Sequence, residues 1–228
     1  MERLRTSAPL HAACEGNMTK VLVLGAGGQI ARHAVAELGS SDGIHLTLLV
    51  RNSRKLTQTP ANAKVIQGDV LDSKKLEDVV RGQDIVYANL TGEDLDAQAK
   101  SVIASMQVAG VKRLIFVLSL GIYDEVPGKF GAWNNATIGE DLKPFRRAAD
   151  AIEASKLDYT IIRPAWLTDE NEIDYELTER DAPFKGTVVS RKSIADLIVK
   201  IIHSPSLHLH GNIGVNKPDT EGDKPYFM

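Results

Sequence analysis

Short apolar runs alternate with amphipathic segments along most of the chain. Six runs are typical of buried strands, at residues 20–24, 45–50, 64–67, 84–89, 113–118 and 159–163. Five segments with apolar residues at helical spacing predict helices, at residues 29–38, 73–80, 94–108, 145–155 and 190–202. Strands that alternate with helices of this length form right-handed βαβ units. The pattern therefore predicts an α/β fold with a doubly wound parallel sheet and helices on both of its faces.

This pattern begins at Met18. The first seventeen residues contain a mildly apolar stretch, but Pro9 and His11 interrupt it, and no signal-peptide core is present. We expect a flexible N-terminal extension over residues 1–17 and a single domain over residues 18–228. Cys14 is the only cysteine. Because it falls in the extension, we expect neither an intrachain disulfide nor a catalytic thiol.

Composition narrows the class of protein. The 228 residues are 43% hydrophobic and 25% charged, as in average globular proteins. The formal net charge of −3 argues against a protein that binds nucleic acid directly. No apolar run approaches the roughly 18 to 20 residues that would span a bilayer. We expect a cytoplasmic protein without membrane contact, as a monomer or a weak homodimer.

A glycine-rich turn follows the first predicted strand. Gly25, Gly27 and Gly28 occupy the turn, and Gln29 and Ile30 open the next helix. Glycines allow a tight turn and a close approach of a pyrophosphate, and the helix N-terminus offers N–H groups and a favourable dipole. A structural turn alone would also use glycine. The position directly after a buried first strand favours dinucleotide binding and a Rossmann-type domain.

The end of the second strand suggests which dinucleotide binds. NAD-selective sites carry an acidic residue there, whereas this chain has Arg51, followed by Arg54 and Lys55. A guanidinium forms charge-assisted, bidentate hydrogen bonds with a 2′-phosphate. We therefore expect NADP(H) to be preferred over NAD(H). The alternative is that these cations only form a solvated surface loop.

Two later strand ends extend the predicted groove. Asp69 and Val70 follow the third strand, where the carboxylate would accept a hydrogen bond from adenine and the valine would pack on its ring. An Asx turn is almost as good an explanation of Asp69. Asn89 and Leu90 follow the fourth strand and would lie beside the adenosine ribose.

Several segments together resemble the atypical short-chain dehydrogenases/reductases, in particular the NmrA-like, NAD(P)H-binding branch. The resemblance runs from Met18 to roughly Val215 and rests on these segments: LGAGGQIA, GDVLD, YANLTG, FVLSLGIY, RRAADAIEAS and LDYTIIRPAWLT. It implies that NADP(H) lies along the carboxyl edge of the sheet. It also implies an active-site serine at Ser119, and a nicotinamide pocket lined by the segment that contains Pro164, Ala165 and Trp166.

The chain departs from the superfamily at the catalytic helix. Active dehydrogenases carry Tyr-x-x-x-Lys there, and the resemblance places Leu142 and Arg146 at these two positions. Leucine cannot donate a proton, although Arg146 could still hold ribose hydroxyls. Tyr123, four residues after Ser119, is a candidate partner of that serine in catalysis. Alternatively, Tyr123 only packs its own loop.

Two long connections in the second half of the chain are expected to form the substrate pocket. Residues 133–135 and 166–184 are expected to be long connections that form a small substrate-loop region. His208 and His210 alternate and could share one face of a strand. Two histidines without a third ligand do not make a metal site, so we expect no metal.

Two functions of different classes remain open. The first is an NADP(H)-dependent oxidoreductase that acts on a flavin, a quinone or a similar conjugated small molecule, whose reduced anion needs no positioned acid. The second is a non-catalytic redox sensor that binds NADP(H) and reports its presence to a protein partner. A nucleotide-sugar epimerase is less favoured, because it needs the missing tyrosine.

Overall fold

The computed structural model describes residues 18–228, and the predicted N-terminal extension with Cys14 lies outside them. The central sheet has eight strands in the order β3-β2-β1-β4-β5-β6-β10-β8. They are β1 (Thr19–Leu24), β2 (Ile44–Val50), β3 (Ala63–Gln67), β4 (Ile85–Ala88), β5 (Arg113–Val117), β6 (Asp158–Pro164), β8 (Glu176–Thr178) and β10 (Gly211–Asn216). All neighbours pair in parallel except β8, which is antiparallel to β10. The predicted Rossmann-type parallel sheet is confirmed.

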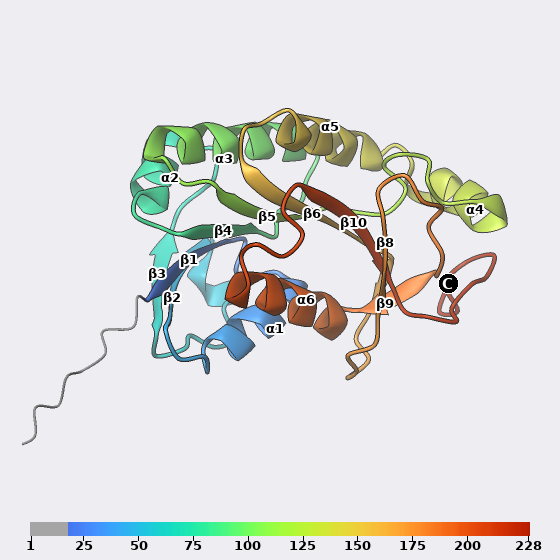
Figure 1. The fold of residues 1–228 in the computed structure, drawn as a ribbon, viewed down its shortest axis with the longest axis horizontal. Coiled ribbons are helices and arrows are strands. Elements are labelled where there is room, and N and C mark those ends of the chain that lie inside the picture. Colours follow the sequence, from blue (N-terminus) through green and yellow to red (C-terminus); the bar gives the residue numbers. More distant parts are fainter. Residues whose placement is uncertain (1–17) are drawn as a thin grey trace, which may run out of the picture.

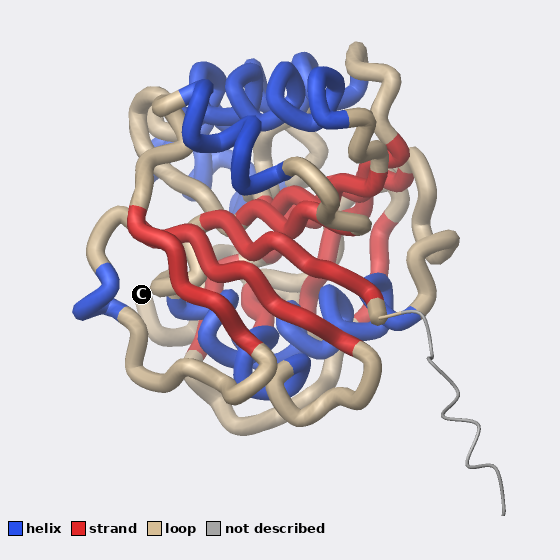
Figure 2. Tube along the Cα trace, turned by 90° about the vertical axis from the view of Figure 1, so that its left-hand side faces the viewer, coloured by secondary structure: helices blue, strands red, loops and turns tan. Residues whose placement is uncertain are grey.

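Helices cover both faces of this sheet, as Figures 1 and 2 show. One layer holds α1 (Gln29–Leu38) and α6 (Arg191–His203), and the other holds α2 (Ser73–Val80), α3 (Leu95–Ala109) and α5 (Leu142–Glu153). Each layer has its own apolar core, because the strands are buried on both faces and alternate residues point to opposite sides. No helix within residues 18–228 is long and apolar enough to cross a membrane.

The strand order places the ends of the first six strands side by side. β1 pairs with β2 on one side and with β4 on the other, so the chain reverses its direction of winding at β1. Since these strands are parallel, the segments that follow β1, β2, β3, β4, β5 and β6 all meet at one edge. Ligands of open α/β sheets bind at this edge, next to the point of reversal.

Two segments differ from the predicted loops. Residues 133–135 lie in a helix, α4 (Gly128–Ile138), and residues 166–184 contain the short strands β7 (Trp166–Thr168) and β8. β7 pairs in parallel with β9 (Val188–Ser190). The helix was missed because its sequence is rich in glycine and asparagine and lacks an apolar stripe; it buries only Phe130 and Asn134.

The paired histidines do not share a strand face. His208 and His210 lie in the turn before β10, with φ of +53° and +54°. Arg113 holds this turn, since its Nη2 donates to the Leu207 carbonyl at 3.0 Å and to Thr160 Oγ1 at 2.8 Å. Burial lowers the pKa of Arg113 to about 10, so the side chain is still a cation at neutral pH.

Candidate active site

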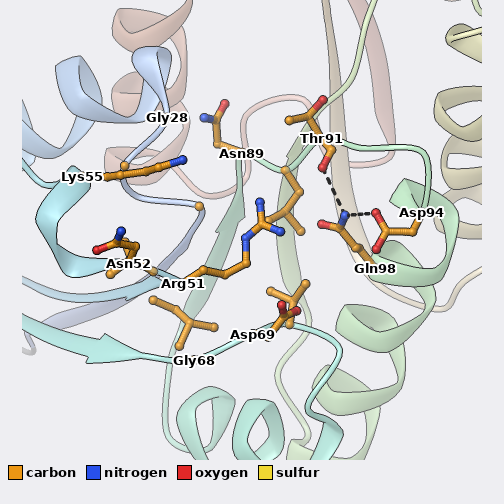
Figure 3. Close-up of a pocket in the computed structure, with 16 residues that line it drawn as sticks. Gly28, Arg51, Asn52, Lys55, Gly68, Asp69, Asn89, Thr91, Asp94 and Gln98 are labelled. Atoms are coloured by element: carbon orange, nitrogen blue, oxygen red, sulfur yellow. Dashed lines mark hydrogen bonds between the residues drawn. The ribbon is translucent and has the colours of Figure 1, made fainter.

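A cavity of about 410 Å³ opens at the carboxyl ends of β1, β2, β3 and β4, at the predicted edge (Figure 3). Its lining residues come from four strand ends: Gly25, Gly27, Gly28, Leu49, Val50, Arg51, Asn52, Lys55, Gly68, Asp69, Val70, Asn89, Leu90, Thr91, Asp94 and Gln98. Figure 3 shows the Arg51 guanidinium extending between the glycine turn and Asp69. The structure thus brings together the residues that the sequence placed after separate strands.

The glycine turn leaves its backbone open. Gly25 has φ of +73°, and a Cβ there would overlap the Asn89 carbonyl oxygen. A Cβ on Gly28 would overlap the Asn89 side-chain amide. Gly28 is also the N-cap of α1 and contributes no capping side chain, so the first N–H groups of the helix face outward unshielded. This cradle fits a pyrophosphate, which needs close backbone approach and N–H donors.

Two cations line the same cavity without partners. Within residues 18–228, neither the Arg51 guanidinium nor the Lys55 ammonium forms a hydrogen bond or an ion pair with another side chain. Lys55 ends the 3-10 helix η1 (Ser53–Lys55), and its carbonyl accepts a hydrogen bond from Arg32 Nη2 of α1 at 3.4 Å. Arg54 is exposed and does not line the cavity.

The side of this cavity formed by the end of β3 and by α3 could hold an adenine ring, because polar and apolar side chains meet there. Asp69 Oδ1 accepts a hydrogen bond from the Leu71 amide at 2.9 Å, so the Asx turn, the alternative explanation of Asp69, is present. The sequence did not point to Gln98, whose Nε2 donates to the Thr91 carbonyl at 3.1 Å and to Asp94 Oδ1 at 2.6 Å. Val70 supplies a buried apolar wall beside them.

A second cavity of about 390 Å³ continues the groove. It shares Gly28, Asn89, Leu90 and Thr91 with the first cavity, and its other lining residues are Gln29, Ile30, Val117, Leu118, Ser119, Phe145, Pro164, Ala165, Leu167 and Arg191. Ser119 lies two residues after the end of β5, and its hydroxyl has no partner among the described residues. The two cavities form one groove from Arg51 to Ser119.

Tyr123 and Arg146 do not line this groove, in contrast to the sequence-based expectation. Both line a different cavity, with Arg180. Arg146 Nε donates to Asp150 Oδ1 at 2.8 Å, and its guanidinium lies 4.6 Å from the centre of the Tyr123 ring. The Tyr123 hydroxyl accepts from Asn212 Nδ2 at 2.8 Å. Burial and the nearby Glu153 carboxylate raise the pKa of Tyr123, so its hydroxyl stays protonated.

The spacing of residues along α5 explains why Arg146 does not line the groove. Phe145, the preceding residue of α5, faces the second cavity, and consecutive residues of a helix point about 100° apart. Leu142, at the position of the superfamily's tyrosine, is buried in the core. No side chain of α5 that lines the cavity can therefore donate a proton.

Trp166 also differs from the expectation. Its side chain turns toward α4, where Nε1 donates to Asn134 Oδ1 at 2.8 Å and the ring packs 5.0 Å from that of Trp133. The next residue, Leu167, lines the second cavity instead. Sequence reasoning also missed Arg191, which faces this cavity from the start of α6.

Comparisons with known proteins agree with this geometry. The NAD(P)H-binding family matches residues 25–205. The chain belongs to this family. It is 30% identical over 192 residues to a curated protein of Bacillus subtilis (strain 168), "Uncharacterized sugar epimerase YhfK", and the match covers 77% of this chain and 79% of that protein.

Two solved structures are similar over nearly the whole described chain. A Rossmann-fold NAD(P)-binding family protein from Shigella flexneri is 59% identical, with a TM-score of 0.81 and coverage of 92% of this chain and 100% of that chain. A short-chain dehydrogenase/reductase from Veillonella parvula DSM 2008, in complex with NADP, is 28% identical, with a TM-score of 0.82 and coverage of 92% and 99%. The resemblance to atypical short-chain dehydrogenases/reductases is thereby confirmed.

Proposed function

We propose that the chain is an NADP(H)-dependent oxidoreductase whose substrate is a flavin, a quinone or a similar conjugated acceptor. One observation carries the proposal. The groove has two unpaired cations at one end, and at the other end Ser119 lies in a cavity lined by no Asp, Glu, His, Lys, Cys or Tyr within residues 18–228.

The cations favour NADP(H) over NAD(H). The 2′-phosphate is the group by which these two coenzymes differ. Arg51 offers it a planar guanidinium that can donate two parallel hydrogen bonds, and Lys55 offers it a compact ammonium group. The glycine turn and the start of α1 would hold the pyrophosphate. Pro164 and Ala165 would orient the ring that carries the hydride. NADPH, when bound, supplies that hydride.

The lining of the second cavity limits the substrate. Hydride addition to a simple ketone builds up a localised, strongly basic alkoxide, which needs a positioned acid to protonate it. Hydride addition to a flavin or quinone leaves a delocalised anion, which water can protonate. Ser119 can donate one hydrogen bond to the developing oxyanion, but it cannot act as a general acid near neutral pH. The lining therefore suits conjugated acceptors.

The coenzyme assignment is tested at Arg51. Arg51→Ala should weaken NADPH binding by about ten- to a hundredfold and leave NADH binding almost unchanged, because one charge-assisted contact to the phosphate is lost. Arg54→Ala is the matched control, since Arg54 is a neighbouring exposed cation outside the cavity. Equal affinity of the wild type for both coenzymes, measured by titration of nicotinamide fluorescence, would contradict the assignment.

The reaction class is tested with an acceptor panel. NADPH consumption should be rapid with riboflavin or a naphthoquinone and slow with simple ketones. Efficient turnover of a simple ketone would contradict the proposed substrate class. Tight NADPH binding without turnover of any acceptor would favour a redox sensor.

A further inference from the structure

Arg191 is the one charged residue in the lining of the second cavity, within residues 18–228. It is the first residue of α6, and its side chain is only 16% exposed. The other side chains of this cavity are apolar or neutral. A single cation in such surroundings attracts an anion more strongly than a cation in water does, because the local dielectric is low.

The hydrogen bonds of Arg191 leave one edge of its guanidinium unused. Nη1 donates to Asp169 Oδ1 at 2.9 Å and to the Leu167 carbonyl at 3.4 Å. Nε is buried and has no acceptor among the described residues, and Nη2 also forms no hydrogen bond with them. Nη2, unlike Nε, is not buried, so it can donate a charge-assisted hydrogen bond to a carboxylate or phosphate.

Helix stability does not account for a cation at this position. The N-terminus of a helix carries a partial positive charge, so an arginine in the first turn is unfavourable. The first turn of α6 has no acidic residue, and Ser190 already caps the helix by accepting from the Ser193 amide at 2.9 Å. Asp169 is 79% exposed, so water screens its pairing with Arg191. The placement disfavours the helix but suits an anion, which the dipole of α6 would also attract.

We propose that Arg191 binds an anionic group, a carboxylate or a phosphate, of the conjugated acceptor. This inference rests on the proposed function, because it assigns a part of the substrate to the same groove. Asp169 fixes the orientation of the guanidinium through Nη1, and Nη2 donates to the anion. The preferred substrate is therefore a planar conjugated molecule with an acidic side chain.

Matched acceptor pairs test this proposal. FMN and riboflavin share a ring system and differ by a phosphate, and a naphthoquinone with a propionate side chain differs from its methyl ester by a carboxylate. For the wild type, kcat/KM should be about tenfold higher for the anionic member of at least one pair. The pair that shows the effect identifies the anion. Arg191→Gln should abolish this preference, so that kcat/KM becomes equal for the two members of the pair.

Lys192→Gln is the matched control. Lys192 follows Arg191 in the same turn, but its Nζ donates to Asn171 Oδ1 at 2.8 Å and it does not line the cavity. This variant should keep the full preference for the anionic acceptors. Loss of the preference in both variants would point to a general electrostatic effect and would overturn the assignment of Arg191.

A binding measurement separates this inference from the proposed function. The four acceptors are titrated into the protein saturated with NADP⁺, with flavin or tryptophan fluorescence as the readout. Tighter binding of an anionic acceptor that depends on Arg191 would support the subsite even if no acceptor is reduced. Equal affinities within both pairs, or an Arg191→Gln variant that lowers only NADPH affinity, would overturn it.

Discussion

Arg163 and Glu125 form a buried ion pair at the base of the loop that carries Ser119. The Arg163 side chain is fully buried and that of Glu125 is 5% exposed. Glu125 also accepts hydrogen bonds from the amides of Gly121 and Tyr123, at 3.0 and 2.9 Å. Arg163 Nε donates to Asn212 Oδ1 at 2.8 Å. The pair thus ties the loop after β5 to β6 and β10.

Removal of one partner should destabilise the fold strongly. Glu125→Ala leaves an uncompensated buried guanidinium and two loop amides without their acceptor. We expect the free energy of unfolding to fall by about 3–5 kcal/mol, as measured by urea denaturation. Glu140→Ala is the control, because Glu140 is an exposed acid whose pair with Lys143 contributes little. A loss below about 1 kcal/mol in Glu125→Ala would show that the ion pair does not stabilise the fold.

The sequence predicted the strands and α-helices from β1 to β5 because each of them has one strong signal. The strands are continuous apolar runs, and α1, for example, begins and ends where its apolar spacing predicts, at Gln29 and Leu38. β10 has no such signal. Gly211, Asn212, Gly214 and Asn216 interrupt its apolar residues, and only pairing with β6 and β8 makes it a strand.

Some residues of the candidate site could be predicted from the sequence, and others could not. Gly25, Gly28 and Arg51 follow strand ends, so the topology of a parallel sheet brings them together. Arg146 could not be placed from the sequence, because one step along α5 decides whether Phe145 or Arg146 faces the cavity. Arg191 comes from a distant helix, and its role depends on hydrogen bonds that no local pattern contains.

Substitution in the glycine turn should remove coenzyme binding without unfolding the protein. In Gly28→Val the new side chain would overlap the Asn89 amide and fill the cradle at the start of α1. We expect NADPH affinity to fall by at least about a hundredfold, with a circular dichroism spectrum like that of the wild type. Gly222→Ala, which adds a methyl group in ordinary van der Waals contact and outside both cavities, should retain binding. Normal affinity in Gly28→Val would place the pyrophosphate elsewhere.

Removal of one buried hydroxyl, that of Tyr87, should stabilise the fold rather than destabilise it. Tyr87 of β4 is fully buried, and its hydroxyl has no hydrogen-bond partner among the described residues. Burial raises the pKa of Tyr87, so the group stays neutral. Tyr87→Phe removes an unsatisfied polar atom and should stabilise the fold by about 1 kcal/mol.

Tyr175→Phe is the matched control for that change. The Tyr175 hydroxyl donates to Asp196 Oδ2 at 2.8 Å and accepts from Lys200 Nζ at 3.1 Å. Loss of these hydrogen bonds should destabilise the fold by about 1 kcal/mol. Thermal and urea unfolding of both variants measure whether each change stabilises or destabilises the fold. A destabilised Tyr87→Phe variant would show that the Tyr87 hydroxyl has a hydrogen-bond partner in solution.

Ser119→Ala tests how much the reaction depends on the Ser119 hydroxyl. Ser119 lines the second cavity with a free Oγ, so it can stabilise the developing oxyanion but leaves the coenzyme-binding end of the groove unchanged. With a delocalised acceptor, kcat should fall by about tenfold, less than the 10² to 10³ that follows the loss of an oxyanion-hole donor in acyl transfer. NADPH affinity should stay at the wild-type value. Ser155→Ala, at a site outside both cavities, should change neither quantity. A loss of kcat beyond about a thousandfold with riboflavin would mean that Ser119 takes a direct part in proton transfer, and the reaction would then need an acid after all.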